Sequence, residues 1–320
     1  MSFLEVLYFI VPSAIFYAAP LIFGAIGGVF SERSGVVNIG IEGIMVIGAF
    51  VGIVFNLFTA DMFGSFTPWA SLVAAMVVGA IFSLFLAVAA ISFRADQTVT
   101  GVALNLLGIA IALFSVKMLF EGKGQTDFIS ERFARFDIPL LSDIPFLGPL
   151  LFHNLYGTSI LAVALAVVAW FIIYKTPFGL RLRSVGEHPM AADTMGINVT
   201  KMRYIAVMIS GGLAGIGGAI YAQTITNDFG HATINGQGFM AIAAMIFGKW
   251  HPVGAMGAAL FFGLAQALSI AGGTIPYVKE IPPVFLTILP YVLTILALAG
   301  FIGKATAPKA TGTPYIKGKR

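Results

Sequence analysis

The stretch KTPFGLRLRSVGEHPMAADTMGINVTKMR, residues 175–203, is a polar and basic segment in a chain that is otherwise mainly apolar. Residues 157–174 before it and 204–222 after it are close to the ~20 apolar residues needed to cross the hydrocarbon core of a membrane. A polar segment between two such spans has to lie outside the lipid. The pattern therefore predicts a helical membrane protein with a structured loop at one membrane face.

The composition is that of a polytopic membrane protein. Hydrophobic residues make up 58% of the chain, charged residues make up 10%, and the mean hydropathy is +0.95. Soluble proteins carry about 25% charged residues. Because lipid accommodates only helices and closed barrels, and these apolar runs lack the alternation of barrel strands, we expect an all-α fold.

About nine transmembrane helices are expected, separated by proline, glycine or charge. The seventh span is short for a full crossing. The first span lacks the basic start and the small-residue cleavage site of a signal peptide, so we expect it to be retained. The spans cover residues 9–30, 36–58, 69–91, 99–120, 157–174, 204–222, 239–247, 253–271 and 283–300.

Lysine and arginine indicate the orientation, because they gather on the cytoplasmic side of membrane proteins. If residues 175–203 are cytoplasmic and the spans alternate, thirteen of the 18 basic residues lie inside. The N-terminus is then outside, and the C-terminus, with a basic tail at 301–320, is inside. The thirteen are Arg33, Arg94, Lys175, Arg181, Arg183, Lys201, Arg203, Lys249, Lys304, Lys309, Lys317, Lys319 and Arg320.

Several kinds of chemistry lack the residues that they need. The chain has no cysteine, and its four histidines stand apart without metal-ligand spacing. No Gly-Lys pair is followed by the serine or threonine of a phosphate-binding loop, so we expect no ATPase activity in the chain itself. Its net charge is +4, and its basic residues lie along the membrane borders instead of clustering on one face. We therefore expect no nucleic acid partner, no metal and no cofactor.

Two pairs of segments resemble each other weakly. Residues 24–30, GAIGGVF, echo residues 214–221, AGIGGAIY, and residues 42–49 echo residues 237–244. Five spans separate the copies, so they would face opposite ways across the bilayer, as in the inverted repeats of transporters. Helices rich in glycine and alanine also match by chance, so the repeat supports a transporter fold without deciding it.

The run SERSGVVNIGIEG, residues 31–43, turns over a charged corner and re-enters the membrane with a carboxylate. A carboxylate within a span is costly and usually faces protein or a water-filled cavity, which makes Glu42 a functional candidate. Equally, it could lie near the membrane border, pair with Arg33 or cap a helix end. The glycines in this run would allow a broken or closely packed helix.

Two elements are expected within the basic loop. Residues 177–183 are interpreted as the end of the preceding span. Residues 187–196 predict a short helix, because Pro189 suits a first turn and Gly196 suits a C-terminal stop. Such a helix could act as a lever between a soluble partner and the spans, or be an ordinary loop helix.

Four stretches resemble, in chain order, the permease subunits of bacterial ABC importers. They are SERSGVVNIGIEGIMVIGAF from Ser31, ADQTVTGVALNLL from Ala95, TPFGLRLRSVGEHPMAADTMGINV from Thr176 and IFGKWHPVGA from Ile246. The nearest branch is associated with nucleoside uptake and is related to sugar and branched-chain amino-acid permeases. The resemblance implies one type II ABC importer-like permease domain over residues 1–320, in the bacterial cytoplasmic (inner) membrane.

The resemblance also implies partners and a substrate. It implies a separate cytoplasmic ATPase, an extracytoplasmic substrate-binding lipoprotein and a second, related permease subunit in the lipid membrane. Nucleosides are the expected substrate, with riboflavin or a simple sugar left open. An ion-coupled secondary transporter is the rival class, but it would place ionisable residues near mid-membrane, whereas the acidic residues here cluster at borders and in loops.

Roles for particular residues follow from the same resemblance. In the coupling loop 175–203, residues 191–196 match the AAxxxG core of a coupling helix, although Glu187 stands four residues before Ala191 instead of beside it. This departure leaves the docking contacts open. The expected coupling residues are Glu187, Pro189, Ala191, Ala192, Asp193 and Gly196. The expected pathway or gate residues, which could instead be hydrogen-bond links between helices, are Asn38, Glu42, Asn105 and Gln237.

The longest loop on the expected outer side, residues 121–156, holds five carboxylates against three basic residues, and it contains three prolines. We expect an ordered loop with short elements. It would present Asp137 and Asp143 to the binding protein, and a merely solvated loop is the alternative.

Overall fold

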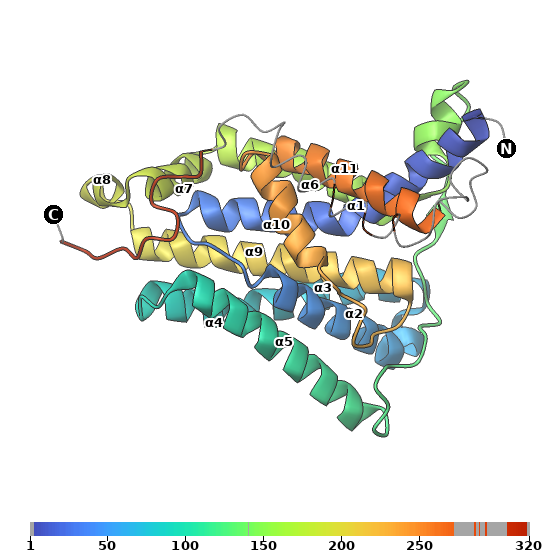
Figure 1. Cartoon of the computed structure of the whole chain (residues 1–320), viewed down its shortest axis with the longest axis horizontal. Coiled ribbons are helices and arrows are strands. Elements are labelled where there is room, and N and C mark those ends of the chain that lie inside the picture. The colour runs from blue at the N-terminus through green and yellow to red at the C-terminus, as the bar shows by residue number, and fades with distance from the viewer. Residues whose placement is uncertain are drawn as a thin grey trace.

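Long helices run between the two ends of the molecule (Figure 1). The computed structural model describes residues 3–139, 141–271, 285, 288, 292 and 306–318. The long helices are α1 (Phe3–Arg33), α2 (Ile41–Phe63), α3 (Thr67–Phe82), α5 (Gln97–Leu119), α6 (Gly157–Lys175), α9 (Val199–Tyr221) and α11 (Pro252–Ala271). The short ones are η1 (Gly64–Phe66), α4 (Leu84–Ala87), η2 (Val88–Ser92), η3 (Gly148–Phe152), α7 (Pro177–Glu187), α8 (Pro189–Thr194), η4 (Ala222–Thr226) and α10 (Gln237–Phe247).

Six stretches of the described chain are long and apolar enough to cross a membrane. One of them covers residues 41–92, which would be about 78 Å as a straight helix. It turns at Gly64, whose φ of +50° favours glycine, so α2 and α3 form an antiparallel hairpin. The first eight expected spans coincide with helices, and all of the ninth, residues 283–300, except 285, 288 and 292 lies outside the described residues.

Two boundaries predicted from the sequence were wrong. The second span was expected from residue 36, but α2 begins only at Ile41, and residues 34–40 are not helical. Residues 177–183 do not end the preceding span. They belong to a separate helix, α7, because Thr176 breaks the chain direction and caps α7 by accepting a hydrogen bond from the N–H of Gly179 at 3.2 Å.

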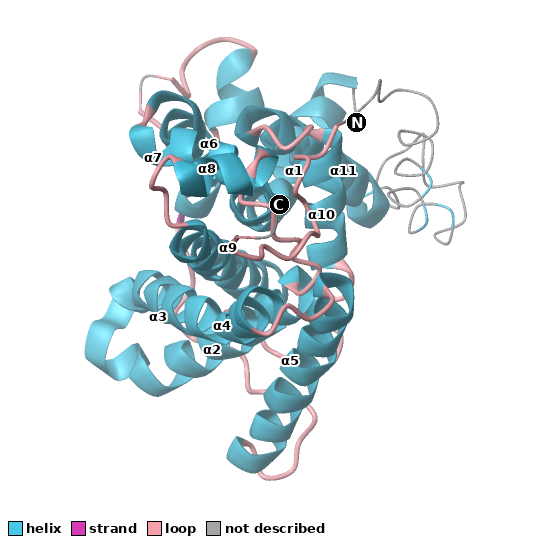
Figure 2. Cartoon of the chain, turned by 90° about the vertical axis from the view of Figure 1, so that its left-hand side faces the viewer, coloured by secondary structure: helices cyan, strands magenta, loops and turns pink. Residues whose placement is uncertain are grey.

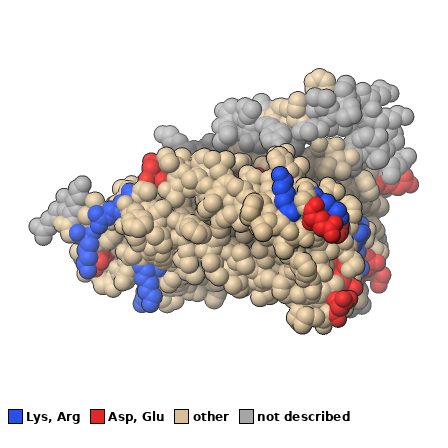
Figure 3. Space-filling model, turned by 90° about the horizontal axis from the view of Figure 1, so that it is seen from below, with Lys and Arg blue, Asp and Glu red and all other residues tan. Residues whose placement is uncertain are grey.

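On the face that Figure 3 shows, the charged side chains lie toward the two ends of the bundle, and the described surface between them is almost free of charge. One end, called the basic end below, carries α7, α8 and the described C-terminal segment (Figure 1). The opposite end, called the loop end, carries residues 120–156. A charge-free belt between two charged ends is the surface that a bilayer requires.

The long loop at the loop end is ordered, as expected. Its two-residue strands β1 (Arg135–Phe136) and β2 (Leu155–Tyr156) pair antiparallel. Its first part is tied to the segment after η4, because the N–H of Thr126 donates to the carbonyl of Phe229 and the N–H of Ile129 donates to that of Asn227. The loop therefore holds the start of that segment in place.

Close glycine contacts set the directions of the central helices. A Cβ on Gly48 would overlap Gly215, and one on Gly52 would overlap Ala219, so α2 runs parallel to α9. Likewise, Gly24 meets Ala241 and Gly28 meets Met245, so α10 runs parallel to α1. Small residues let helix backbones approach in lipid, where burial of apolar surface does not drive helices together.

Helix α1 itself runs antiparallel to α9, because Gly27 lies against Ser210 and Gly217 lies against Pro20. It follows that α2 and α10 point in opposite directions. The segments that echo each other in sequence thus occupy inverted positions in the bundle, α1 opposite α9 and α2 opposite α10.

These contacts predict the effect of a single added methyl group. Gly218→Ala would push a Cβ into the carbonyl of Met45 on α2 and should destabilise the protein by about 1–3 kcal/mol, the usual cost of overpacking. The measurement is the midpoint of thermal unfolding of the purified chain in detergent. Gly257→Ala on α11 is the matched control, because no atom of the described residues lies within 4 Å of its added Cβ. Equal midpoints for the two variants would contradict the packing described here.

Candidate functional site

Two non-helical segments enter the bundle from opposite ends and each leads into a helix (Figure 1). Residues 34–40 leave α1 at the basic end and lead into α2, and residues 227–236 leave η4 at the loop end and lead into α10. Non-helical backbone is tolerated at membrane depth only where protein or a water-filled cavity surrounds it. Accordingly, Ser34, Val36 and Asn38 are buried.

Helix α10 does not cross the membrane. Its eleven residues span about 16 Å, half of the hydrocarbon thickness. The sequence had indicated a short seventh span, and the structure gives the reason: residues 227–236 supply the other half of the crossing without forming a helix.

The N-termini of α2 and α10 meet at Glu42. This side chain is 5% exposed, and its carboxylate accepts hydrogen bonds from the N–H groups of Gly236 at 2.7 Å and Gly238 at 2.6 Å. A helix N-terminus carries a partial positive charge and unpaired N–H groups, so a carboxylate there is stabilising. Of the open interpretations of Glu42, the structure supports the helix cap, and the capped helix is α10. Pairing with Arg33 was wrong, because that guanidinium bonds Tyr174 and the carbonyl of Trp250.

Asn105 caps the other N-terminus. Its Oδ1 accepts from the N–H of Gly43 at 2.8 Å, and its Nδ2 donates to the carbonyl of Ile39 at 3.0 Å. Asn105 therefore joins α5 to the start of α2, and a Cβ on Gly43 would overlap its backbone. One amide thus satisfies a donor and an acceptor at the break in the helix.

Asn38 and Gln237 complete the set of residues expected from the sequence. The Nδ2 of Asn38 donates to the hydroxyl of Ser210 at 2.9 Å, and Ser210 is the middle residue of α9. The Oε1 of Gln237 accepts from Gln266 on α11 at 3.0 Å. All four expected residues therefore lie where the two half-crossings meet, near mid-depth, and link neighbouring helices.

Sequence reasoning missed three residues of this polar centre. They are Ser210, Gln266 and Gln97, whose Oε1 accepts from the N–H of Val37 at 2.7 Å. Polar residues within apolar spans were the available signal. The Oδ1 of Asn38 and the Nε2 of Gln97 are buried without a hydrogen-bond partner among the described residues, so the centre keeps capacity for further hydrogen bonds.

The expected coupling residues lie at the basic end. Helix α8 begins at Pro189, and Gly196 follows it with φ +81°, as the sequence predicted. Ala192 is buried against the bundle, whereas Ala191 and Gly196 face outward and Asp193 is half-buried. Glu187 does not belong to this helix, contrary to expectation: it is the last residue of α7, and His188 separates the two helices.

The described C-terminal segment crosses the basic end between these elements (Figure 2). The N–H of Ala310 donates to the carbonyl of Gly186 at 2.9 Å, and that of Gly312 donates to the carbonyl of Gly35 at 3.1 Å. The carboxylate of Glu187 accepts from the N–H of Lys309 at 3.4 Å. Residues 308–315, called the strap below, thus connect the end of α7 to the segment that leads into α2.

Arg203 lies beneath the strap, with 1% of the residue exposed. Its guanidinium donates to the carbonyl of Ser34 at 3.2 Å and to that of Thr313 at 3.0 Å. Asp193 and Tyr315 face each other next to it: burial and the Asp193 carboxylate raise the pKa of the Tyr315 hydroxyl. Helix α8, the strap and residues 34–35 therefore form one packed corner.

The two acidic residues expected at the loop end differ in their surroundings. Asp137 accepts from the N–H of Asn154 at 2.6 Å and lies 3.3 Å from His153. Asp143 is exposed and has no ion pair among the described residues.

Membrane-spanning helices, an inverted arrangement and two half-crossings that meet at mid-depth define this protein as a transport permease. The chain belongs to the permease family described as "Branched-chain amino acid transport system / permease component", whose model matches residues 10–298.

The chain is similar to several ABC transporter permeases. It is 64% identical over 320 residues, all of both chains, to the "Guanosine ABC transporter permease protein NupQ" of Bacillus subtilis (strain 168). It is 52% identical over 319 residues, all of both chains, to the "Nucleoside ABC transporter permease protein NupC" of Lactococcus lactis subsp. cremoris (strain MG1363). It is 26% identical over 269 residues, 82% of this chain and 73% of that protein, to the "Guanosine ABC transporter permease protein NupP" of the same Bacillus.

The Glu42 cap predicts graded losses of stability. Glu42→Ala leaves the buried N–H group of Gly238 and the half-buried one of Gly236 unpaired, and should cost up to about 1–3 kcal/mol for each. Glu42→Gln keeps one acceptor and should fall between Glu42→Ala and the unchanged chain. Thermal unfolding in detergent measures this, with Asp61→Asn, an exposed carboxylate at the far end of α2, as the control. A Glu42→Ala protein as stable as the control would contradict the cap.

Proposed function

We propose that this chain is the transmembrane subunit of an ABC importer for nucleosides. The observation that carries the substrate is similarity over the full length: the two relatives at 64% and 52% identity are named as guanosine and nucleoside permeases. The polar centre is chemically suited to such a cargo, because amide groups can exchange hydrogen bonds with ribose hydroxyls and base edges. The family membership, and the lack of a phosphate-binding loop in the sequence, favour a subunit that is not itself an ATPase.

In this proposal the basic end faces the cytoplasm. The N-terminus is then outside and the C-terminus inside, in the cytoplasmic membrane of a bacterium. The gathering of lysine and arginine at that end supports this orientation. The loop end would then face the source of the substrate.

A cytoplasmic ATPase is the proposed partner at the basic end. Helix α7 and the residue after α8 present an apolar surface there, with Leu180 of α7 62% exposed and Met195 81% exposed. Large exposed apolar side chains beside a short helix suit a cleft in a partner protein. A movement of α8 would reach residues 34–35 through the strap and Arg203, and from there the start of α2.

Two further partners are proposed. A second, related permease would complete the pathway, and the existence of two Bacillus permeases both named for guanosine, which resemble this chain at 64% and 26% identity, supports a heterodimer. A substrate-binding lipoprotein would dock at the loop end. Asp143 is the better candidate contact there, because Asp137 is already engaged by His153 and Asn154.

The substrate is tested by uptake. Cells that lack the chain should lose most accumulation of labelled guanosine at low external concentration, and the restored gene should recover it. Unlabelled nucleosides should compete, whereas riboflavin and simple sugars should not. Undiminished guanosine uptake without the chain, or competition by riboflavin or a sugar alone, would refute the nucleoside assignment.

The coupling assignment is tested at α8. Asp193→Lys and Gly196→Val should each lower uptake by about tenfold or more at unchanged membrane abundance, because the first reverses a charge beside the strap and the second places a side chain at φ +81°. Asp61→Lys gives the same charge reversal at the loop end and should have little effect on uptake. Normal uptake by both α8 variants at normal abundance would refute the assignment.

A further inference from the structure

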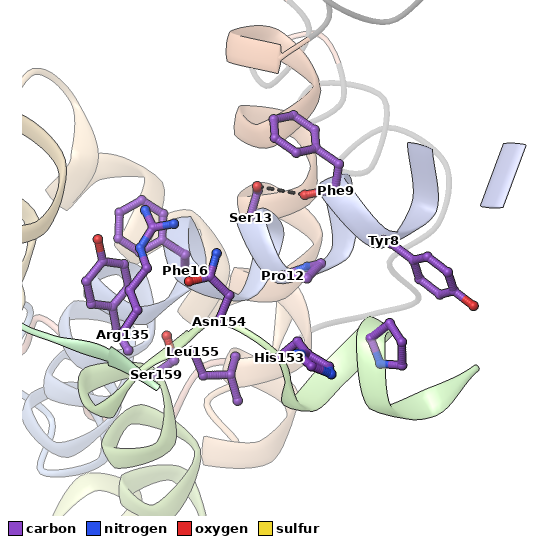
Figure 4. Close-up of a pocket in the computed structure, with 12 residues that line it drawn as sticks. Tyr8, Phe9, Pro12, Ser13, Phe16, Arg135, His153, Asn154, Leu155 and Ser159 are labelled. Carbon is purple, nitrogen blue, oxygen red and sulfur yellow. Dashed lines mark hydrogen bonds between the residues drawn. The ribbon is translucent and has the colours of Figure 1, made fainter. Parts of the chain in front are cut away.

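A small pocket at the loop end is not part of the centre described above (Figure 4). It lies between the start of α1, strand β2 and the start of α6, and its volume is about 140 Å³. An apolar cavity of roughly that size holds a benzene molecule, so the space suffices for a phosphate group. Arg135, Asn154 and Ser159 lie together on one side of it, away from Tyr8.

The N-terminus of a long helix borders the pocket, which Tyr156 and Ser159 line. Helix α6 has 19 residues, and no side chain caps its first turn, since the residue before it is Tyr156. The first N–H groups of a helix lack partners within the helix and carry a partial positive charge. An uncapped N-terminus of this kind favours an anion.

A second observation at the same place is independent of the helix. Ser159 is 3% exposed, it lines the pocket, and its hydroxyl has no hydrogen-bond partner among the described residues. Buried hydroxyl groups are nearly always paired, so an unpaired one next to a cavity indicates a missing partner. An oxygen atom of a ligand would provide it.

Arg135 adds a positive charge. Its guanidinium lies over the ring of Tyr156 at 4.7 Å, and no carboxylate of the described residues forms an ion pair with it. The nearby carboxylate of Asp137 is occupied by His153 and by the N–H of Asn154. The stacked ring holds the guanidinium in place for a planar, two-point contact with a phosphate.

The depth of the pocket indicates where the ligand comes from. Helix α6 is about 28 Å long, close to the thickness of the hydrocarbon core, so its first turn lies at the membrane border. Tyrosine and tryptophan mark that border in membrane proteins, and Tyr8 and Tyr156 line the pocket. Phe9, 46% exposed, lies beside them. Lipid headgroups lie at this depth.

We propose that this pocket binds a phosphate group, that of a phospholipid headgroup in the leaflet at the loop end. The first turn of α6 and the Ser159 hydroxyl donate to its oxygen atoms, Arg135 balances its charge, and the exposed ring of Phe9 contacts the lipid chains. Free inorganic phosphate has the same chemistry and would be the other source of the bound phosphate group.

The experiment uses the full chain, purified and stripped of lipid in detergent. Phosphatidylglycerol is titrated against it, and binding is read by native mass spectrometry and by the rise in the midpoint of thermal unfolding. Inorganic phosphate is titrated in a parallel series. Arg135→Gln and Ser159→Ala should each weaken binding about tenfold, and Ser159→Asp, which places a carboxylate in the pocket, should abolish it.

Controls separate the site from general effects. Arg132→Gln removes the same charge three residues away, outside the pocket, and should bind as the unchanged chain does. Ser159→Ala removes only an unpaired hydroxyl, so its unfolding midpoint without lipid should not fall. Binding of phosphatidylglycerol with this pattern supports a lipid site, and the same pattern with inorganic phosphate supports a site for the free anion. No binding of either, or an equal loss in Arg132→Gln, would overturn the proposal.

Discussion

The carboxylate of Glu42 at the N-terminus of α10 is the contact on which the centre of this protein depends. Two helices end within the membrane, and each exposes N–H groups that lipid cannot satisfy. Glu42 lies in the first turn of α2 and accepts from Gly236 and Gly238 before and within α10. The carboxylate of Glu42 thereby stabilises the N-terminus of its own helix, α2, and accepts hydrogen bonds from N–H groups at the N-terminus of α10. This contact ties the two halves of the inverted arrangement together.

Close glycine contacts make this meeting possible. They bring α2 against α9 and α10 against α1, so the two half-crossings are held by a pair of antiparallel helices. For the proposed transport function, opening a pathway requires the N-termini of α2 and α10 to separate or to shift together. The packed corner of α8, the strap and Arg203 contacts the start of the segment 34–40, and the N-terminus of α2 follows the end of that segment. A partner bound at the basic end could act on this corner.

Much of the helical pattern could be predicted from the sequence, because a span is a local property of composition and length. The short seventh span, Pro189 and Gly196 carried local signals that the structure bears out. Helix α7 was missed, because its boundary with α6 depends on a single residue, Thr176, in a loop whose composition resembles a span end.

The contacts of the site were less predictable. Glu42, Asn38, Asn105 and Gln237 stood out as polar residues near apolar runs, but the partners of Glu42 lie 194 and 196 residues away. Similarly, nothing local to residues 308–315 or to Arg203 indicates that they pack together. Such pairings are set by the tertiary arrangement and leave no periodic signal in the chain.

Hydrogen–deuterium exchange of the peptide that covers residues 234–242 tests the central claim most directly. In the unchanged chain the N–H groups of Gly236 and Gly238 should exchange slowly, because both are hydrogen-bonded to the carboxylate of Glu42. In Glu42→Ala the same peptide should exchange much faster, while peptides from α1 keep their protection. Equal protection of residues 234–242 in both proteins would show that Glu42 does not hold the two half-crossings together.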